Sequence, residues 1–193
     1  MEISNVYVYG LENAIRASKF PMAVSSEECS SEVTDTTKKL GSCKTGSGHD
    51  SYLKGIIVQF EMKFSNKMSV ELERYHFIDF VSSQSTMHRI TKFNLRKQCN
   101  EYVDDRIIDI AQEMIDVYNS LEDKRTEFAK DLYLRILYNI PSGFELTAAF
   151  TTNYQQLKTI FKQRKDHRLP EWRVFCEWIY ELPMFKDLVL GGC

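Results

Sequence analysis

The sequence predicts a mixed α/β fold in a single domain that spans residues 1–193. Hydrophobic residues make up 43% and charged residues 27%, which is ordinary globular usage and excludes disordered, collagen-like and coiled-coil chains. Residue patterns follow the order strand, helix, loop, strand, helices, strand, helices, with no repeat at a fixed period. A chain of 193 residues is long enough for one core of ordinary size.

The N-terminal quarter begins with a short strand and ends in a long loop. Residues 4–9 alternate β-branched and aromatic types before Gly10, which predicts a strand followed by a turn. Residues 11–23 suit a short helix. Residues 24–50 are rich in Ser, Thr, Gly and charge, which predicts a helical turn within a long loop. Such loops are usually functional or mobile.

The middle of the chain contains the clearest strand and then a series of helices. Residues 54–64 alternate apolar and polar side chains, the pattern of a half-buried strand. Apolar residues recur near the helical period in 67–83, in 107–121 and in 123–139. The last of these predicted helices ends before the helix-breaking segment 140–143.

The residue pattern of the C-terminal quarter predicts a second strand and two helices. Residues 144–152 are rich in β formers, while 153–165 and 171–182 return to helical spacing up to Pro183. An apolar stripe in the last helix predicts core packing or a subunit interface rather than a cofactor platform. The stripe consists of Trp172, Phe175, Trp178 and Ile179.

Charge and targeting signals limit the classes of function. With 25 Lys+Arg against 27 Asp+Glu, the net charge of −2 gives no broad basic field for a nucleic acid polymer. The N-terminus lacks a signal-peptide pattern, and no run of 18 apolar residues occurs, so neither export nor a membrane span is expected.

Cysteine and histidine patterns point away from disulfide and metal chemistry. The five cysteines are scattered without a CxxC pair, which fits a reducing cytoplasm and no zinc site. They are Cys29, Cys43, Cys99, Cys176 and Cys193. His76 and Asp79 lie three apart in the helix predicted over 67–83, where we interpret them as core-boundary residues. No bound metal is expected.

Three segments between residues 49 and 180 carry side chains suited to a nucleotide. The first runs from His49 to Leu53 and is preceded by Gly48, the second covers 84–94, and the third extends from Ile140 to Arg173. A His-Arg pair beside amides suits a diphosphate and the edges of flavin and pyrimidine rings, because Arg is a rigid fork of donors and an amide both donates and accepts.

In order and separation, these segments resemble the flavin-dependent thymidylate synthase (ThyX) family. The first is similar to GHxSxxEH, the second to Q-x-x-RHR-x-x-S-x-N-E-x-S-x-R, and the third to LP…T-x-N-x-R-x-L followed by a later Arg and E-I-R. The resemblance implies a ThyX-like fold with a central antiparallel sheet flanked by helices. It also implies a homotetramer whose sites are shared between subunits.

The activity that this resemblance implies is reductive methylation of dUMP to dTMP. Methylenetetrahydrofolate would donate the carbon, and FAD reduced by NADPH would supply the hydride. By resemblance, the flavin would contact His49, Ser51, His88, Arg89, Ile90, Asn94, Asn153 and His167. The nucleotide would contact Gln84, Lys97 and Arg164. Arg164 would be catalytic, because it stabilises negative charge developing on the pyrimidine.

Several positions depart from the family pattern. Met87 replaces an Arg, Leu95 a Glu, Lys97 a Ser and Cys99 the final Arg, while Leu137 stands where the family has a nucleotide-contacting Arg. Arg135, two positions from Leu137, could replace that Arg only if the helix end were rearranged.

Two interpretations of the second segment therefore stay open. An alternative register aligns Asn100-Glu101 with the family's N-E pair. The cations Lys92, Arg96 and Lys97 indicate either an anion site or a solvated basic helix end.

These departures leave two alternatives to thymidylate synthesis. One is an enzyme that acts on another pyrimidine nucleotide, and the other is a non-catalytic protein that binds a nucleotide or flavin.

Overall fold

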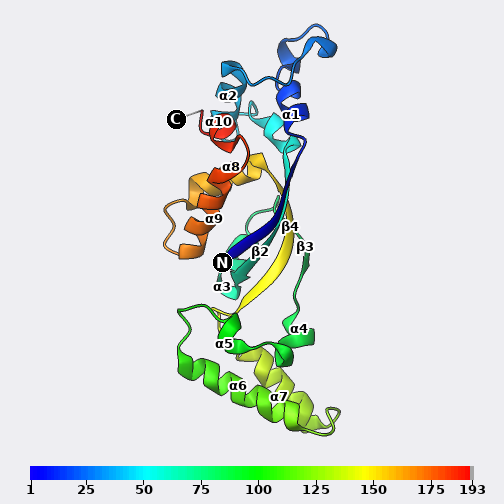
Figure 1. Cartoon of the computed structure of the whole chain (residues 1–193), viewed down its shortest axis with the longest axis vertical. Coiled ribbons are helices and arrows are strands. Elements are labelled where there is room, and N and C mark those ends of the chain that lie inside the picture. Colours follow the sequence, from blue (N-terminus) through cyan, green and yellow to red (C-terminus); the bar gives the residue numbers. More distant parts are fainter. Residues whose placement is uncertain (192–193) are drawn as a thin grey trace. The chain divides into compact units, whose positions relative to one another are not determined.

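A computed structural model describes residues 1–191, and Cys193 lies outside the described residues. Its centre is a four-stranded antiparallel sheet in the order β1-β2-β4-β3 (Figure 1). The strands are β1 (Glu2–Tyr9), β2 (Ile57–Ser65), β3 (Asp79–Ser83) and β4 (Glu145–Asn153). The strands predicted at 54–64 and 144–152 are β2 and β4, which are neighbours in one sheet, so this prediction is confirmed.

The chain divides into two compact units, and the boundary falls within all four strands. We call residues 3–61, 75–81 and 149–191 the aromatic-core unit. Residues 1–2, 62–74 and 82–148 form the helical-hairpin unit.

The aromatic-core unit packs aromatic rings between its strands and α9 (Pro170–Glu181). The Phe60 ring lies 5.3 Å from Phe150, 5.9 Å from Phe175 and 4.6 Å from Trp178. Trp172, Phe175 and Ile179 are fully buried, so the apolar stripe predicted in this helix is confirmed as packing. The helices are α1 (Leu11–Ala17), η1 (Phe20–Met22), η2 (Ser26–Glu28), α2 (Asp35–Ser42), η3 (Ser51–Gly55), α8 (Tyr154–Arg164), α9 (Pro170–Glu181) and α10 (Phe185–Val189).

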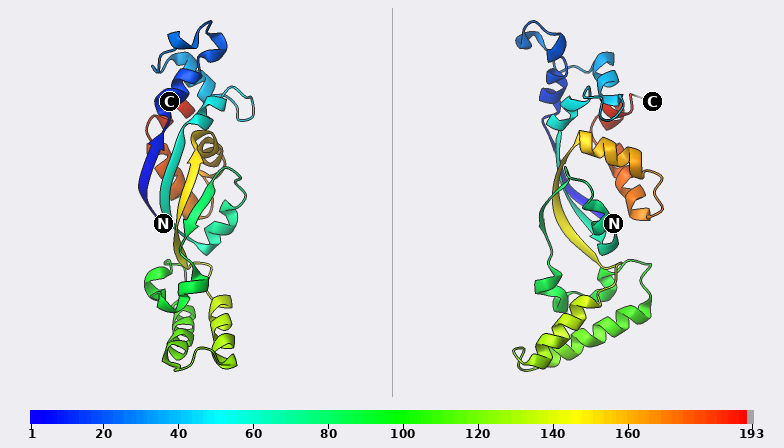
Figure 2. Two further views of the ribbon diagram at one scale, coloured as in Figure 1. Left: turned by 90° about the vertical axis from the view of Figure 1, so that its right-hand side faces the viewer. Right: turned by 180° about the vertical axis from the view of Figure 1, so that it is seen from behind.

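In the helical-hairpin unit, α6 and α7 lie side by side in every view (Figure 2). Its helices are α3 (Asn66–Leu72), α4 (Thr86–Arg89), η4 (Ile90–Lys92), α5 (Leu95–Gln98), α6 (Asp105–Ser120) and α7 (Glu127–Tyr138). The core of this unit joins buried residues of η4, α5, α6 and α7 to Phe144. Asp104 and Thr126 cap the N-termini of α6 and α7, which explains where these two predicted helices begin.

The turn before β4 requires a glycine. A Cβ on Gly143 would lie 2.4 Å from Val103 and 2.6 Å from the Asn100 side chain. The Asn100 N–H donates to the carbonyl of Gly143 at 2.9 Å, which ties this turn to the segment that precedes α6. The predicted helix-breaking segment 140–143 therefore also allows the backbone at Gly143 to lie close to Asn100 and Val103.

The helix predicted over 67–83 is wrong in its second half. Helix α3 ends at Leu72, and β3 occupies Asp79–Ser83. The apolar residues of 75–81 fitted a helical period by chance, but they lie in a turn and on a fully exposed strand. His76 and Asp79 are therefore not on one helix, and both are exposed rather than at the core boundary.

The long loop predicted at 24–50 contains more helix than expected. Helix α2 has eight residues, and Thr34 and Thr37 close a capping box at its start. Such a capping box, visible in the sequence as Thr34 and Thr37, is a signal for the start of a helix that the prediction of a long loop did not use. The helix predicted over 11–23 is present as α1 and the short turn η1.

Candidate functional site

The residues proposed for ligand binding lie in both units. The helical-hairpin unit contains Gln84, His88, Arg89, Ile90, Asn94 and Lys97. The aromatic-core unit contains His49, Ser51, Asn153, Arg164 and His167.

Helix α4 presents the His-Arg pair to solvent. His88 and Arg89 are exposed, and neither side chain forms a hydrogen bond or ion pair with any residue of the described part of the chain. Their donors are thus accessible to an anionic ligand. Ile90 differs, because its side chain is fully buried in the core of the unit, so only its backbone could face a ligand.

The two amide residues of this segment also hold the backbone in place. Gln84 donates its N–H to the Thr147 carbonyl and accepts the Thr147 N–H on Oε1, both at 3.0 Å. Asn94 caps α5 by accepting the Lys97 N–H on Oδ1 at 3.1 Å. In each case the side-chain oxygen is occupied, which leaves the amide nitrogen as the group for a ligand.

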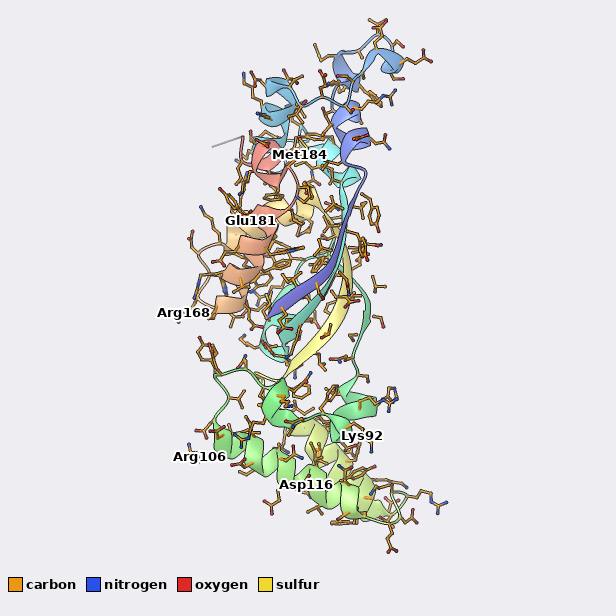
Figure 3. The ribbon with its side chains drawn as sticks, in the orientation of Figure 1. Lys92, Arg106, Asp116, Arg168, Glu181 and Met184 are labelled. Carbon is orange, nitrogen blue, oxygen red and sulfur yellow. The ribbon has the colours of Figure 1, made fainter. Side chains whose placement is uncertain are left out.

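Of the three cations near α5, Arg96 is already engaged. Its guanidinium donates to Asp105 at 2.6 Å and to Asp109 at 2.5 Å. The hydrogen bond that Arg96 donates to Asp105, with the charge of Asp109, raises the pKa of Arg96. Lys92, which Figure 3 labels on this unit, and Lys97 remain as the cations of the predicted anion site.

The alternative register places Asn100 and Glu101 at a cavity of about 480 Å³. Asp104 and Asp105 also line this cavity, where Arg96 is the one cation among the described lining residues. Asn100 Oδ1 accepts the N–H of Tyr102 at 3.2 Å. Because carboxylates outnumber cations here, the cavity is poorly suited to a nucleotide phosphate.

The structure shows what surrounds two residues that bear on the departures from the family pattern. Leu95, aligned with a nucleotide-binding Glu, is 2% exposed and belongs to the core cluster. Arg135, considered as a replacement for the Arg aligned with Leu137, pairs with Asp131 at 2.6 Å on the exposed side of α7. Neither position offers a nucleotide anchor as it stands.

In the aromatic-core unit, Arg164 at the end of α8 belongs to a cluster of rings. Its Nε donates to the hydroxyl of Tyr75 at 2.7 Å. Its guanidinium lies 4.9 Å from the Trp172 ring centre and 5.6 Å from that of Tyr75. Cations at such distances are attracted to the electron-rich faces of aromatic rings.

His167 directly precedes Arg168, which Figure 3 labels, in the segment between α8 and α9. The His167 ring is 6.3 Å from Trp172, and its Nδ1 accepts the N–H of Leu169 at 3.1 Å. In the neutral ring this assigns the proton to Nε2. Arg164 and His167, predicted from separate motif positions, therefore share one aromatic neighbour.

Three of the predicted flavin contacts lie at the starts of two helices. Asn153 directly precedes α8, His49 lies in the loop before η3, and Ser51 is the first residue of η3. Asn153 caps α8 by accepting the N–H of Gln156 at 3.0 Å. His49 and Ser51 are exposed, whereas Asp50 between them is fully buried. Burial would raise the pKa of Asp50, but hydrogen bonds from Lys158 and Gln155 hold it below its usual value.

Sequence analysis missed three residues that organise this unit. Lys158 is fully buried and bonded to Asp50, and Tyr75 is bonded to Arg164. A lysine among the apolar positions of α8 was one available signal. For Tyr75, the spacing Q-x-x-R-H-R also fits Glu71, Arg74, Tyr75 and His76, with changes at three of these positions.

The described residues present neither a metal-ligand cluster nor a membrane-spanning helix. Residues 1–191 contain no group of three or more His, Cys, Asp or Glu side chains placed to hold a metal ion. Among the helices of the described residues, none combines the length and apolar character needed to cross a membrane.

The four-stranded antiparallel sheet with its surrounding helices is the fold of flavin-dependent thymidylate synthases. The chain is similar to ThyX from Helicobacter pylori, in a crystal structure with FAD and dUMP, with a TM-score of 0.71 and 15% identity. A second structure of that enzyme with FAD and dUMP gives 0.72 and 16%. Each alignment covers 100% of this chain and 99% of the other.

The structural comparison confirms the ThyX-like fold inferred from the sequence motifs. No family model matches the sequence, and no curated protein is significantly similar to it. At such low identity, the likeness establishes the fold alone.

Proposed function

We propose that this chain is a FAD-dependent thymidylate synthase-like enzyme that converts dUMP to dTMP, with methylenetetrahydrofolate and NADPH as co-substrates. The observation that carries the proposal is the full-length likeness to a ThyX structure that contains FAD and dUMP. This coverage also supports treating residues 1–193 as one ThyX-like domain. The described cysteines are free thiols, which suits a reducing cytoplasm.

Fit to the flavin rests on the donors that the chain leaves accessible. Arg89 and His88 have no partner within residues 1–191, and they suit the diphosphate of FAD. Asn94 and Asn153 each cap a helix through the side-chain oxygen, so the amide nitrogen of each can still donate to a ligand. His49 and Ser51, on either side of Asp50 in the sequence, are both exposed. When bound, FAD supplies the hydride chemistry.

On the substrate side, the protein's own contribution is to bind and polarise the pyrimidine. In this proposal, Arg164 stabilises charge that develops on the base, which contributes about 3 kcal/mol for comparable donors. Gln84 and Lys97 contact the nucleotide. By resemblance, the complete site combines residues of several subunits in a homotetramer. A stable monomer in solution scattering would remove this premise.

The second candidate function is a relative with a changed nucleotide pocket or without catalysis. It is favoured by Leu95, a buried leucine where the family pattern has an acidic anchor, and by Met87, which is 58% exposed where the family has an Arg. A hydrogen bond that involves a charged group is worth about 1.5–3 kcal/mol, so losing both anchors would weaken dUMP binding severely.

Flavin retention tests the proposed cofactor site. Arg89→Ala should release FAD readily, because it removes charge-assisted bonds to the diphosphate and lowers affinity by about tenfold or more. The measurement is the flavin absorbance of purified protein after gel filtration with added FAD. Arg125→Ala is the control, since Arg125 is an exposed arginine of the same unit that pairs with Asp123. Equal retention by both variants would mean that the match at His88-Arg89 is accidental.

Turnover distinguishes the two candidate functions. With FAD, NADPH, methylenetetrahydrofolate and dUMP, the proposal expects NADPH oxidation together with release of the pyrimidine C5 hydrogen and formation of dTMP. NADPH oxidation without dTMP would favour an enzyme acting on another pyrimidine nucleotide. Protein that binds flavin but neither oxidises NADPH nor exchanges the C5 hydrogen would favour the non-catalytic alternative.

A further inference from the structure

Tyr75 contacts Arg164 through both its hydroxyl and its ring. The residue follows α3 in sequence and is 9% exposed, so its orientation is fixed by packing. Its ring lies 5.7 Å from Trp172 in an edge-on arrangement. Tyr75 thus reaches the end of α8 from a segment 89 residues earlier in the chain.

The hydroxyl of Tyr75 acts both as a hydrogen-bond donor and as an acceptor, with a different partner for each role. It donates to Gln163 Oε1 at 2.9 Å and accepts from Arg164 Nε at 2.7 Å. Because the proton is directed at Gln163, the oxygen lone pairs are directed at Arg164. The bond to Gln163 thus directs the Tyr75 oxygen at Nε of Arg164, and the bond at Nε restricts the orientation of the guanidinium.

We propose that Tyr75 is a positioning residue for Arg164, which it holds in the orientation that receives the pyrimidine nucleotide, with Trp172 as the supporting surface. The inference rests on the proposed function, in which Arg164 contacts the base. An arginine side chain has many rotamers, and ordering it on binding lowers affinity. A guanidinium that is held in advance avoids most of this cost, and its hydrogen bonds are directional.

A double-mutant cycle on dUMP affinity tests this coupling. The four proteins are the full-length wild type, Tyr75→Phe, Arg164→Ala and the double variant, each titrated with dUMP by calorimetry. Tyr75→Phe keeps the ring and removes only the hydroxyl. It should weaken dUMP binding by about tenfold in the wild-type background, as expected for a hydrogen bond to a charged group. It should have no further effect when Arg164 is already alanine.

A matched control separates positioning from general destabilisation. Tyr154 is fully buried in the same unit, and its hydroxyl donates to the Pro183 carbonyl at 2.5 Å. Tyr154→Phe therefore loses a buried hydrogen bond away from Arg164, and dUMP affinity should be unchanged. If Tyr75→Phe fails to fold, Gln163→Leu is the replacement, because Gln163 is exposed and its loss frees the Tyr75 hydroxyl to turn. This variant should weaken binding in the same Arg164-dependent way.

The outcomes separate this inference from the proposed function. Wild-type protein that does not bind dUMP would overturn both. If the wild type binds and Arg164→Ala weakens binding, equal effects of Tyr75→Phe in the two backgrounds, or no effect in either, would overturn the positioning role alone. If Arg164→Ala leaves dUMP affinity unchanged, Arg164 is not a nucleotide contact, and Tyr75 has no such role to support.

Discussion

The buried ammonium of Lys158 should be among the costliest single groups to remove from this protein. It donates to the carbonyls of Gly41 and Cys43 at 2.7 Å each and to Asp50 Oδ2 at 2.6 Å. These three bonds use all its donors. The bonds connect the end of α2 and Asp50 to one nitrogen atom on α8. The Lys158 side chain therefore holds both ends of the loop between α2 and Asp50.

Lys158→Met would leave the Asp50 carboxylate buried without its counter-charge. Removing one partner of a buried ion pair costs about 3–5 kcal/mol. For a chain of this size, that corresponds to a fall in melting temperature of roughly 6–20 °C. Urea unfolding followed by circular dichroism gives the free energy directly, and an unchanged slope would confirm that the difference lies in stability.

Lys162→Met is the control for this experiment, because Lys162 is one turn later on α8 and exposed. Its effect should stay within about 0.5 kcal/mol. The double variant Asp50→Leu with Lys158→Met should recover part of the loss, since an apolar pair no longer contains a lone charge. Recovery stays partial because two backbone carbonyls still lack donors. A cost below about 1 kcal/mol for Lys158→Met would refute the reasoning.

Two further predictions follow from shifted pKa values. Because the folded pKa of Asp50 is lowered, its carboxylate contributes full stability above an unfolded pKa of about 3.9, and that contribution is lost as pH falls through the folded value. Urea midpoints between pH 6 and pH 2 should therefore fall more steeply for the wild type than for Asp50→Asn, and parallel profiles would contradict this. Burial raises the pKa of Cys176 to about 12, so iodoacetamide at pH 8 should label the partly exposed Cys43 first, as read by peptide mass spectrometry. Labelling of both at one rate in native protein would show that Cys176 is accessible.

Amphipathic periodicity was sufficient to locate most of the secondary structure. Strands β2 and β4 and helices α6 and α9 each bury one face, and a side chain's preference for water or core is visible in the sequence itself. The same rule failed for β3, whose residues are all exposed. An edge strand without a buried face has no pattern that separates it from a helix.

Local sequence also suggested which residue types would bind a nucleotide, but it could not show which of them are occupied elsewhere. Ile90 is in the core, Arg96 is paired with two carboxylates, and Leu95 stands where an acidic anchor was sought. Each of these outcomes depends on which way the short helices η4 and α5 face after folding. That orientation is decided by packing against α6 and α7 rather than by neighbours in sequence.

By itself, the sequence determined the class of fold and the candidate motifs, because strand and helix periods and motif spacing are properties of neighbouring residues. Tertiary structure alone decided that Lys158 meets Asp50 and that Arg164 meets Tyr75, since these partners lie 108 and 89 residues apart. The physical reason is that a buried charge or a directed guanidinium is stable only beside a partner within hydrogen-bond distance. The folded sheet and helices bring such partners together, and no local pattern specifies which ones they are.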